Sequence, residues 1–95
     1  MRVALAKVDL FFPYCHSLKE KRHILHKIKD RIFADFKISI HEVDHHDKWQ
    51  RAQLGLAIVG NDALILNGLS DKILEKISNS GLAEVVDSVA EIISY

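Results

Sequence analysis

The segment Glu42-Val43-Asp44-His45-His46-Asp47-Lys48-Trp49-Gln50-Arg51 connects two runs, 37–43 and 50–60, and overlaps their ends. Apolar and polar residues alternate in both runs. Alternation with a period of two indicates β-strands, and the short polar connection indicates an antiparallel hairpin. The positions expected to face the core are Ile38 and Ile40 in the first run and Ala52, Leu54, Leu56 and Ile58 in the second. The segment therefore predicts a strand–loop–strand unit at the centre of the chain.

The residues before this unit predict a strand followed by a helix. Residues 2–12 alternate and Pro13, which has no N–H to donate, ends the strand. Ser17 followed by Glu20 has the pattern of a helix N-cap with a capping box. The apolar stripe of the helix is expected to be Leu18, Leu25, Ile28 and Ile32, and its polar side Lys19, Lys21, Arg22, Lys27 and Lys29.

The residues after the unit predict a second helix and a last strand. Asn61 or Asp62 is expected to cap the helix, Asn79-Ser80-Gly81 to end it, and residues 84–94 to form the strand. The order β-α-β-β-α-β predicts a ferredoxin-like α+β sandwich, with two helices on one face of a four-stranded antiparallel sheet. Right-handed crossovers place the first and third strands in the centre. We expect residues 1–95 to form a single domain.

The charges are balanced overall but unevenly distributed. The chain of 95 residues has 13 Lys and Arg against 13 Asp and Glu. Residues 17–37 carry seven basic and three acidic side chains, whereas residues 61–95 carry two basic and six acidic ones. The basic cluster indicates either a surface that faces a polyanion or a solvated helix that is basic without a binding role.

The sequence gives few indications of the cellular compartment. Cys15 is the only cysteine, so an internal disulfide is excluded and a reducing compartment is expected. The N-terminal residues lack the pattern of a signal peptide, and no apolar run approaches the ~20 residues that span a bilayer. We expect a cytoplasmic protein without a membrane partner.

The sheet face left open by the two helices is the first candidate surface. It is expected to carry Lys7, Asp9, Ser39, His41, Arg51 and Gln53. In one interpretation Lys7, Asp9 and Arg51 form a cross-strand ion network. In the other, the face docks RNA, a partner protein or a second copy of the chain. Sheets of this topology that bind RNA expose aromatic rings, and here only Phe11 and Trp49 are available.

The histidines and carboxylates of the central segment are the second candidate site. His41, His45 and His46 are metal-ligand types, but their spacing matches no known site, so we expect no metal and no cofactor. Glu42 and Asp44 are two residues apart, which on a regular strand places both carboxylates on one face. An enzyme that uses these groups is therefore a third hypothesis.

Several segments together resemble the YlxP-like bacterial family, a domain of unknown function. They are Arg2-Val3-Ala4-Leu5, Ser17-Leu18-Lys19-Glu20-Lys21-Arg22, and Glu42-Val43-Asp44-His45 through Trp49-Gln50-Arg51-Ala52 with Leu54-Gly55. The resemblance implies a ferredoxin-like domain. Members often have genes beside those of a translation initiation factor and a ribosome-binding factor, which implies by association a role near translation.

These observations favour a protein that binds rather than transforms its ligand. The leading hypothesis is an accessory factor for RNA or a ribosomal particle, and the alternative is a homo-oligomeric module closed through the open sheet face. The candidate binding residues are Lys19, Lys21, Arg22, Glu42, Asp44, Trp49 and Arg51.

Overall fold

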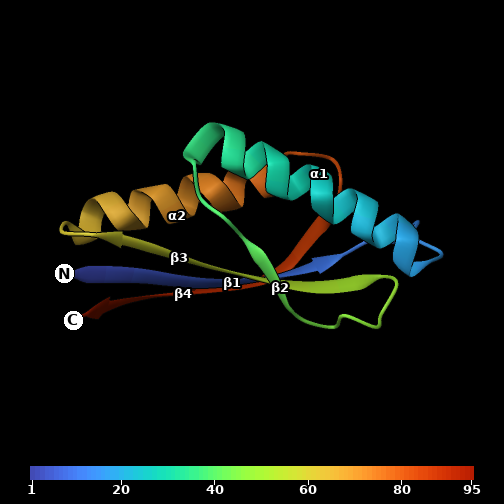
Figure 1. The fold of residues 1–95 in the computed structure, drawn as a ribbon, viewed down its shortest axis with the longest axis horizontal. Helices are drawn as coiled ribbons and strands as arrows, with labels where there is room; N and C mark the ends of the chain where they lie inside the picture. The colour runs from blue at the N-terminus through green and yellow to red at the C-terminus, as the bar shows by residue number, and fades with distance from the viewer.

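The fold is an α+β sandwich of two layers. The computed structural model describes residues 1–95. Its elements are β1 (Arg2–Phe11), α1 (Leu18–Phe36), β2 (His41–Asp44), β3 (Arg51–Gly60), α2 (Ala63–Ser78) and β4 (Glu84–Ser94). The strands form one antiparallel sheet in the order β2-β3-β1-β4, and both helices lie on the same face of it (Figure 1). The ferredoxin-like prediction, with β1 and β3 central, is confirmed.

The two central strands supply the floor of the core because the helix side of each is apolar, from Ala4 to Leu10 in β1 and from Ala52 to Ile58 in β3. Val8 pairs with Leu54 and Leu10 with Ala52, and each of these side chains is almost fully buried. The helices cover this floor with residues at helical spacing. They are Leu25, Ile28 and Ile32 from α1, and Leu66, Ile73 and Ile77 from α2.

Both helices begin at the side chains that the sequence indicates. The Ser17 hydroxyl accepts the backbone N–H of Glu20 at 3.1 Å, and the Glu20 carboxylate in turn accepts the N–H of His16 at 2.9 Å. Asp62, rather than Asn61, caps α2 by accepting the N–H of Leu64 at 2.9 Å. These bonds satisfy N–H groups that have no partner within the helix.

The second strand is shorter than predicted. It covers only His41–Asp44, because the chain leaves α1 through Lys37 in the left-handed region (φ 57°) and reaches the sheet late. Ile40 is nevertheless buried, as predicted, without belonging to the ladder. The pairing with β3 shifts between Glu42 and Asp44, so Val43 forms a β-bulge.

The bulge separates the two carboxylates that a regular strand would place together. Glu42 pairs with Leu54, which faces the helices, whereas Asp44 pairs with Gln53, which faces the open side. The prediction of a carboxylate pair on one strand face is therefore wrong. The structure does not bring Glu42 and Asp44 together as an acid/base couple.

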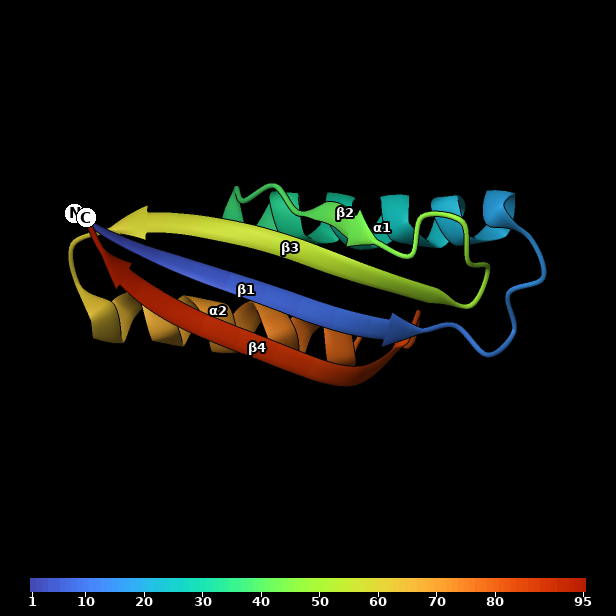
Figure 2. The ribbon, with the colours of Figure 1, turned by 90° about the horizontal axis from the view of Figure 1, so that it is seen from below.

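The molecule has two unlike ends and one uncovered face. The N- and C-termini lie together at one end, and the β1–α1 and β2–β3 loops lie at the other (Figure 1). Seen from below, the sheet lies in front of the helices, so its second face is open (Figure 2). Neither helix is long and apolar enough to cross a membrane.

Candidate functional site

Lys21 organises the end of the molecule that carries the two loops. Its side chain is 0% exposed, although it belongs to the helix face predicted to be polar. The ammonium donates to the backbone carbonyl oxygens of His45 at 2.8 Å, Arg51 at 3.1 Å and His46 at 3.4 Å. It also lies 2.8 Å from the Glu42 carboxylate. The prediction that Lys21 lies on the solvent side of the helix is wrong.

The surroundings of Lys21 explain how a charge is tolerated in the core. An ammonium has three donors, and here it meets carbonyl dipoles and one opposite charge instead of water. The Glu42 side chain is only 14% exposed, and its Oε2 atom has no hydrogen-bond partner apart from this contact with the ammonium. Lys21 and Glu42 therefore form a structural pair that fastens the β2–β3 loop to the first turns of α1.

The β2–β3 loop adopts a backbone shape that suits this contact. His45 lies in the left-handed region (φ 65°), and its carbonyl oxygen accepts both the Lys21 ammonium and the N–H of Lys48 at 3.0 Å. A left-handed residue other than glycine costs about 1–2 kcal/mol. The bonds made by the His45 carbonyl offset that cost, so the loop is held in one conformation.

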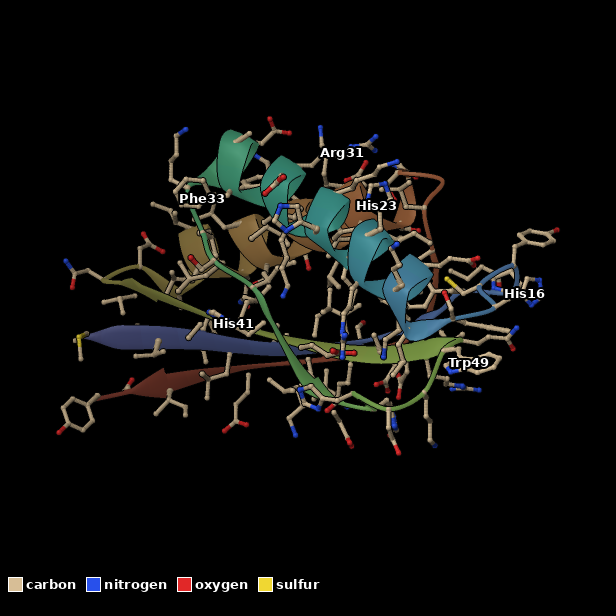
Figure 3. All side chains as sticks on the ribbon, turned by 45° about the vertical axis from the view of Figure 1, so that its right-hand side comes forward. His16, His23, Arg31, Phe33, His41 and Trp49 are labelled. Carbon is tan, nitrogen blue, oxygen red and sulfur yellow. The ribbon has the colours of Figure 1, made fainter.

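Gln50, at the end of the β2–β3 loop, joins this loop to the β1–α1 loop. Its side-chain amide donates to the carbonyl oxygens of Cys15 at 3.1 Å and Pro13 at 3.3 Å. Its own carbonyl accepts the N–H of Phe12 at 2.9 Å. These bonds join the two loops that carry Tyr14 and Trp49, whose side chains are 87% and 53% exposed. Figure 3 shows Trp49 and His16 at this same end of the molecule.

Three exposed cations belong to the same end of the molecule, on the first turns of α1 and in the β2–β3 loop. Lys19 and Arg22 project from the first turns of α1, on either side of Lys21 in sequence, and Lys48 precedes Trp49. None of the three forms an ion pair, since the ion pairs of the chain involve other residues. We name Tyr14, Lys19, Arg22, Lys48 and Trp49 the loop-end surface.

The histidines of the central segment do not gather into a metal site. His41 lies on the open side of the sheet opposite Gly55, and the His46 ring contacts the Glu42 carbonyl oxygen at 3.0 Å. The nearest approach of His45 to a carboxylate is 3.9 Å, to Asp44. No group of three or more His, Cys, Asp or Glu side chains converges in a ligand arrangement.

Asp44 has a local structural role. Its carboxylate accepts the backbone N–H of His45 at 2.7 Å. This bond, together with the nearby His45 ring, holds the pKa of the Asp44 carboxyl below its ordinary value. The carboxylate supports the left-handed turn at His45 and is otherwise solvated.

Arg51 also differs from its sequence interpretation. Its guanidinium lies 5.8 Å from the centre of the Phe11 ring, while Asp9 accepts the Gln53 amide at 3.0 Å. Lys7 is in no ion pair. The interpretation of Lys7, Asp9 and Arg51 as a cross-strand ion network is therefore wrong. A cation–π contact and one neutral–charged hydrogen bond replace it.

The buried Cys15 thiol is not part of the loop-end surface. Burial raises its pKa, and the Glu20 carboxylate raises it further, against the opposing effect of Lys21. A thiol with a raised pKa is a poor nucleophile at neutral pH, so Cys15 is best described as a small apolar core residue.

Sequence reasoning selected Lys19, Arg22 and Trp49 but missed Tyr14, Lys48 and the bracing role of Gln50. The signal available for Tyr14 was an aromatic residue in the short connection between a strand-ending proline and a helix cap. The signal for Lys21 was its spacing, three residues after Leu18 and four before Leu25.

Comparison with known proteins agrees with this class of fold, a ferredoxin-like α+β domain. The chain belongs to the family described as "Protein of unknown function (DUF503)", whose model matches residues 3–90. The "Uncharacterized protein YlxP" of Bacillus subtilis (strain 168) is 44% identical over 59 residues, which are 62% of this chain and 64% of that protein. The match thus covers less than two thirds of the relative's length. The resemblance to the YlxP-like family is confirmed.

Two solved structures are similar at low sequence identity. "De novo designed protein Foldit4" has a TM-score of 0.56 at 11% identity, over 99% of this chain and 97% of that one. A dimeric protein of unknown function and ferredoxin-like fold from Bacteroides fragilis has a TM-score of 0.40 at 11% identity, over 97% and 96% of the two chains. The first likeness concerns the fold alone, and the second is too low to support an argument.

Proposed function

We propose that this protein binds single-stranded RNA through the loop-end surface, as an accessory factor near translation. The observation that carries the proposal is that two exposed aromatic rings, Tyr14 and Trp49, lie on loops that Gln50 holds together. Exposed rings provide stacking platforms for unpaired bases, and each stacked base contributes about 1–3 kcal/mol.

The cations of the loop-end surface supply the contacts to phosphate. Lys19, Arg22 and Lys48 have no acidic partner, so binding phosphate breaks no existing ion pair. The carboxylate of Glu20, the acidic residue closest in sequence to Lys19 and Arg22, already accepts the N–H of His16, and Asp47 beside Lys48 forms no ion pair. Neutralising three phosphates of a single strand predicts a slope of about −2 in log K against log salt.

The rigidity of the two loops supports binding without a large ordering cost. Lys21 and Gln50 fix the backbone beside each ring through five hydrogen bonds to carbonyl oxygens. A surface that is ordered before binding loses less conformational entropy when the ligand arrives. Lys21 thus supports the proposal as a structural residue and not as a phosphate ligand.

The experiment is a fluorescence anisotropy titration of a labelled single-stranded oligoribonucleotide at several salt concentrations. Replacing Lys19 and Arg22 by glutamate is expected to weaken binding at least tenfold and to flatten the salt slope by about 1.4. Trp49→Ala is expected to weaken binding about 5- to 150-fold. The matched control is Lys72→Glu, an exposed charge reversal on α2, which should leave affinity unchanged.

Two results would count against the proposal. The first is binding that does not depend on salt, and the second is an equal loss of affinity in the Lys72→Glu control. Equal affinity for DNA of the same sequence would transfer the assignment from RNA to single-stranded nucleic acid in general, since only RNA has a 2′-hydroxyl to recognise.

A further inference from the structure

The open face of the sheet contains a broad hollow that is separate from the loop-end surface. Its volume is about 1000 Å³. Its lining includes the small residues Gly55 and Ala57, and nine of its 19 lining residues are hydrophobic. Gly55 is required here because a Cβ atom would lie 2.9 Å from the Val43 side chain. The hollow therefore results from the choice of residues in β3.

The end of this face nearest the termini is apolar and exposed. In the register, Val3 lies between Val59 and Ile93, and Leu5 lies beside Ala57. Val59, Leu5 and Ile93 are 65%, 38% and 38% exposed, and Glu91, which pairs with Leu5, is the charged side chain beside them. Contiguous apolar area of this kind on a sheet face indicates an interaction surface rather than scattered exposed residues.

The two rims of the hollow carry opposite charges. Lys37 and His41 line the rim on the β2 side, and Asp87 and Glu91 line the rim on the β4 side. Figure 2 shows β2 and β4 at opposite edges of the sheet. Asp87 also lies directly opposite Asp9 in the register, which is unfavourable unless a cation approaches from outside.

We infer that this face binds a second copy of the same chain, about a two-fold axis parallel to the strands. That axis turns one sheet over sideways, so the β2 rim of one copy meets the β4 rim of the other. Lys37 and His41 then approach Asp87 and Glu91 of the second copy. The axis also keeps positions along the strands, so the apolar end packs on the apolar end.

A two-fold axis across the strands gives the opposite result. It places the β4 rim against the β4 rim of the other copy, so that Asp87 and Glu91 meet their own equivalents. In a centred arrangement it also places the apolar end over Lys7, Asp9 and Gln53. Like charges facing each other across an interface are costly, so the charges select the first arrangement.

The size of the face suits a stable pair. The molecule measures 42 × 22 × 18 Å, and its longest and shortest dimensions are those of the sheet face. Their product, about 750 Å², outlines the whole face, so a standard interface of ~800 Å² per partner requires nearly all of it to be covered. Aligned packing of two sheets with their strands within ~30° is a common arrangement in proteins.

The oligomeric state of the protein tests the inference by sedimentation velocity over a range of micromolar concentrations. A reversible dimer is expected. Val59→Lys, at an exposed position, is expected to weaken self-association at least about tenfold, because it buries an unpaired charge. The matched control is Leu64→Lys, at an exposed apolar position on α2 outside the face, which should sediment like the wild type. A wild-type monomer throughout this range would overturn the inference. If that monomer also binds an apolar dye in the hollow, the face serves a small ligand instead of a second copy.

Charge exchange tests the direction of the axis. Glu91→Lys alone is expected to weaken the dimer, since the acidic rim then repels Lys37 of the second copy. Adding Lys37→Glu in the same chain should restore self-association, because both rims have exchanged their charges. Restoration supports the axis parallel to the strands. A double variant weaker than the single one contradicts it.

Discussion

Replacing Lys21 by methionine is the most informative perturbation of the folded state. Methionine has nearly the same length but removes the ammonium that contacts the Glu42 carboxylate and the carbonyl oxygens of His45, His46 and Arg51. The Glu42 Oε2 atom then has no partner. Breaking a buried pair by removing one member costs about 3–5 kcal/mol. Because Glu42 is 14% exposed and some water can reach it, we expect the lower end, about 3 kcal/mol.

The assay is urea denaturation followed by far-ultraviolet circular dichroism, with thermal melting as a second measurement. A loss of about 3 kcal/mol in a domain of this size lowers Tm by roughly 12–24 °C. The control is Lys19→Met on the same helix, which should stay within about 0.5 kcal/mol of wild type because Lys19 is exposed and unpaired.

A second variant separates the ion pair from simple packing. Combining Lys21→Met with Glu42→Leu removes both charges, so the double variant should recover part of the stability lost in the single one. A loss below about 1 kcal/mol for Lys21→Met, or no recovery in the double variant, would refute the assignment of Lys21 and Glu42 as a buried structural pair.

Three further predictions follow from single contacts. The His45 N–H lowers the pKa of Asp44, so the ionised carboxylate stabilises the fold at neutral pH and this contribution is lost as the pH falls through the lowered pKa. In urea midpoints measured against pH, Asp44→Asn should reduce the loss of stability at acid pH, and an unchanged loss would contradict the prediction. Burial raises the pKa of the Cys15 thiol, so the protein loses stability as the pH rises past the ordinary thiol pKa. Alkylation of Cys15 should be far slower in the native protein than in guanidinium chloride, and equal rates would show that the thiol is accessible. Gly55→Ala should cost about 1–3 kcal/mol in urea denaturation through its clash with Val43, and Val43→Ala in the same chain should relieve it; no relief would mean that the cost arises elsewhere.

The order of the elements could be predicted because each has a clear local signal. Alternation in β1 and β3 defines which side chains face the core, and Ser17 defines where α1 begins. β4 has the predicted bounds, and its register with β1 shifts between Val85 and Asp87. These features depend on period and capping, which are properties of short segments.

The parts that could not be predicted depend on contacts between distant segments. Lys21 occupies an apolar-stripe position, but its burial depends on carbonyl oxygens of a loop more than twenty residues away. The bulge at Val43 moves Glu42 and Asp44 to opposite sides, and no residue type in the segment requires a bulge. The Arg51–Phe11 contact likewise exists only once β1 and β3 pair.

The loop-end surface combines residues that could be predicted from the sequence with one that could not. Lys19, Arg22 and Trp49 could be selected because charged and aromatic residues next to a helix start and a hairpin loop are exposed. Tyr14 joins them only through Gln50, whose amide reaches the Pro13 and Cys15 carbonyl oxygens across 37 and 35 residues of sequence. A composite surface of two loops is defined by the tertiary structure.

The most direct test of RNA binding uses the fluorescence of Trp49, the only tryptophan in the chain. Single-stranded oligoribonucleotide is titrated into the unlabelled wild-type protein at low and high salt. Stacking of a base on this ring predicts saturable quenching that requires higher RNA concentrations as salt increases. Emission that stays unchanged at low salt, with the protein folded by circular dichroism, would contradict the assignment of the loop-end surface as an RNA site.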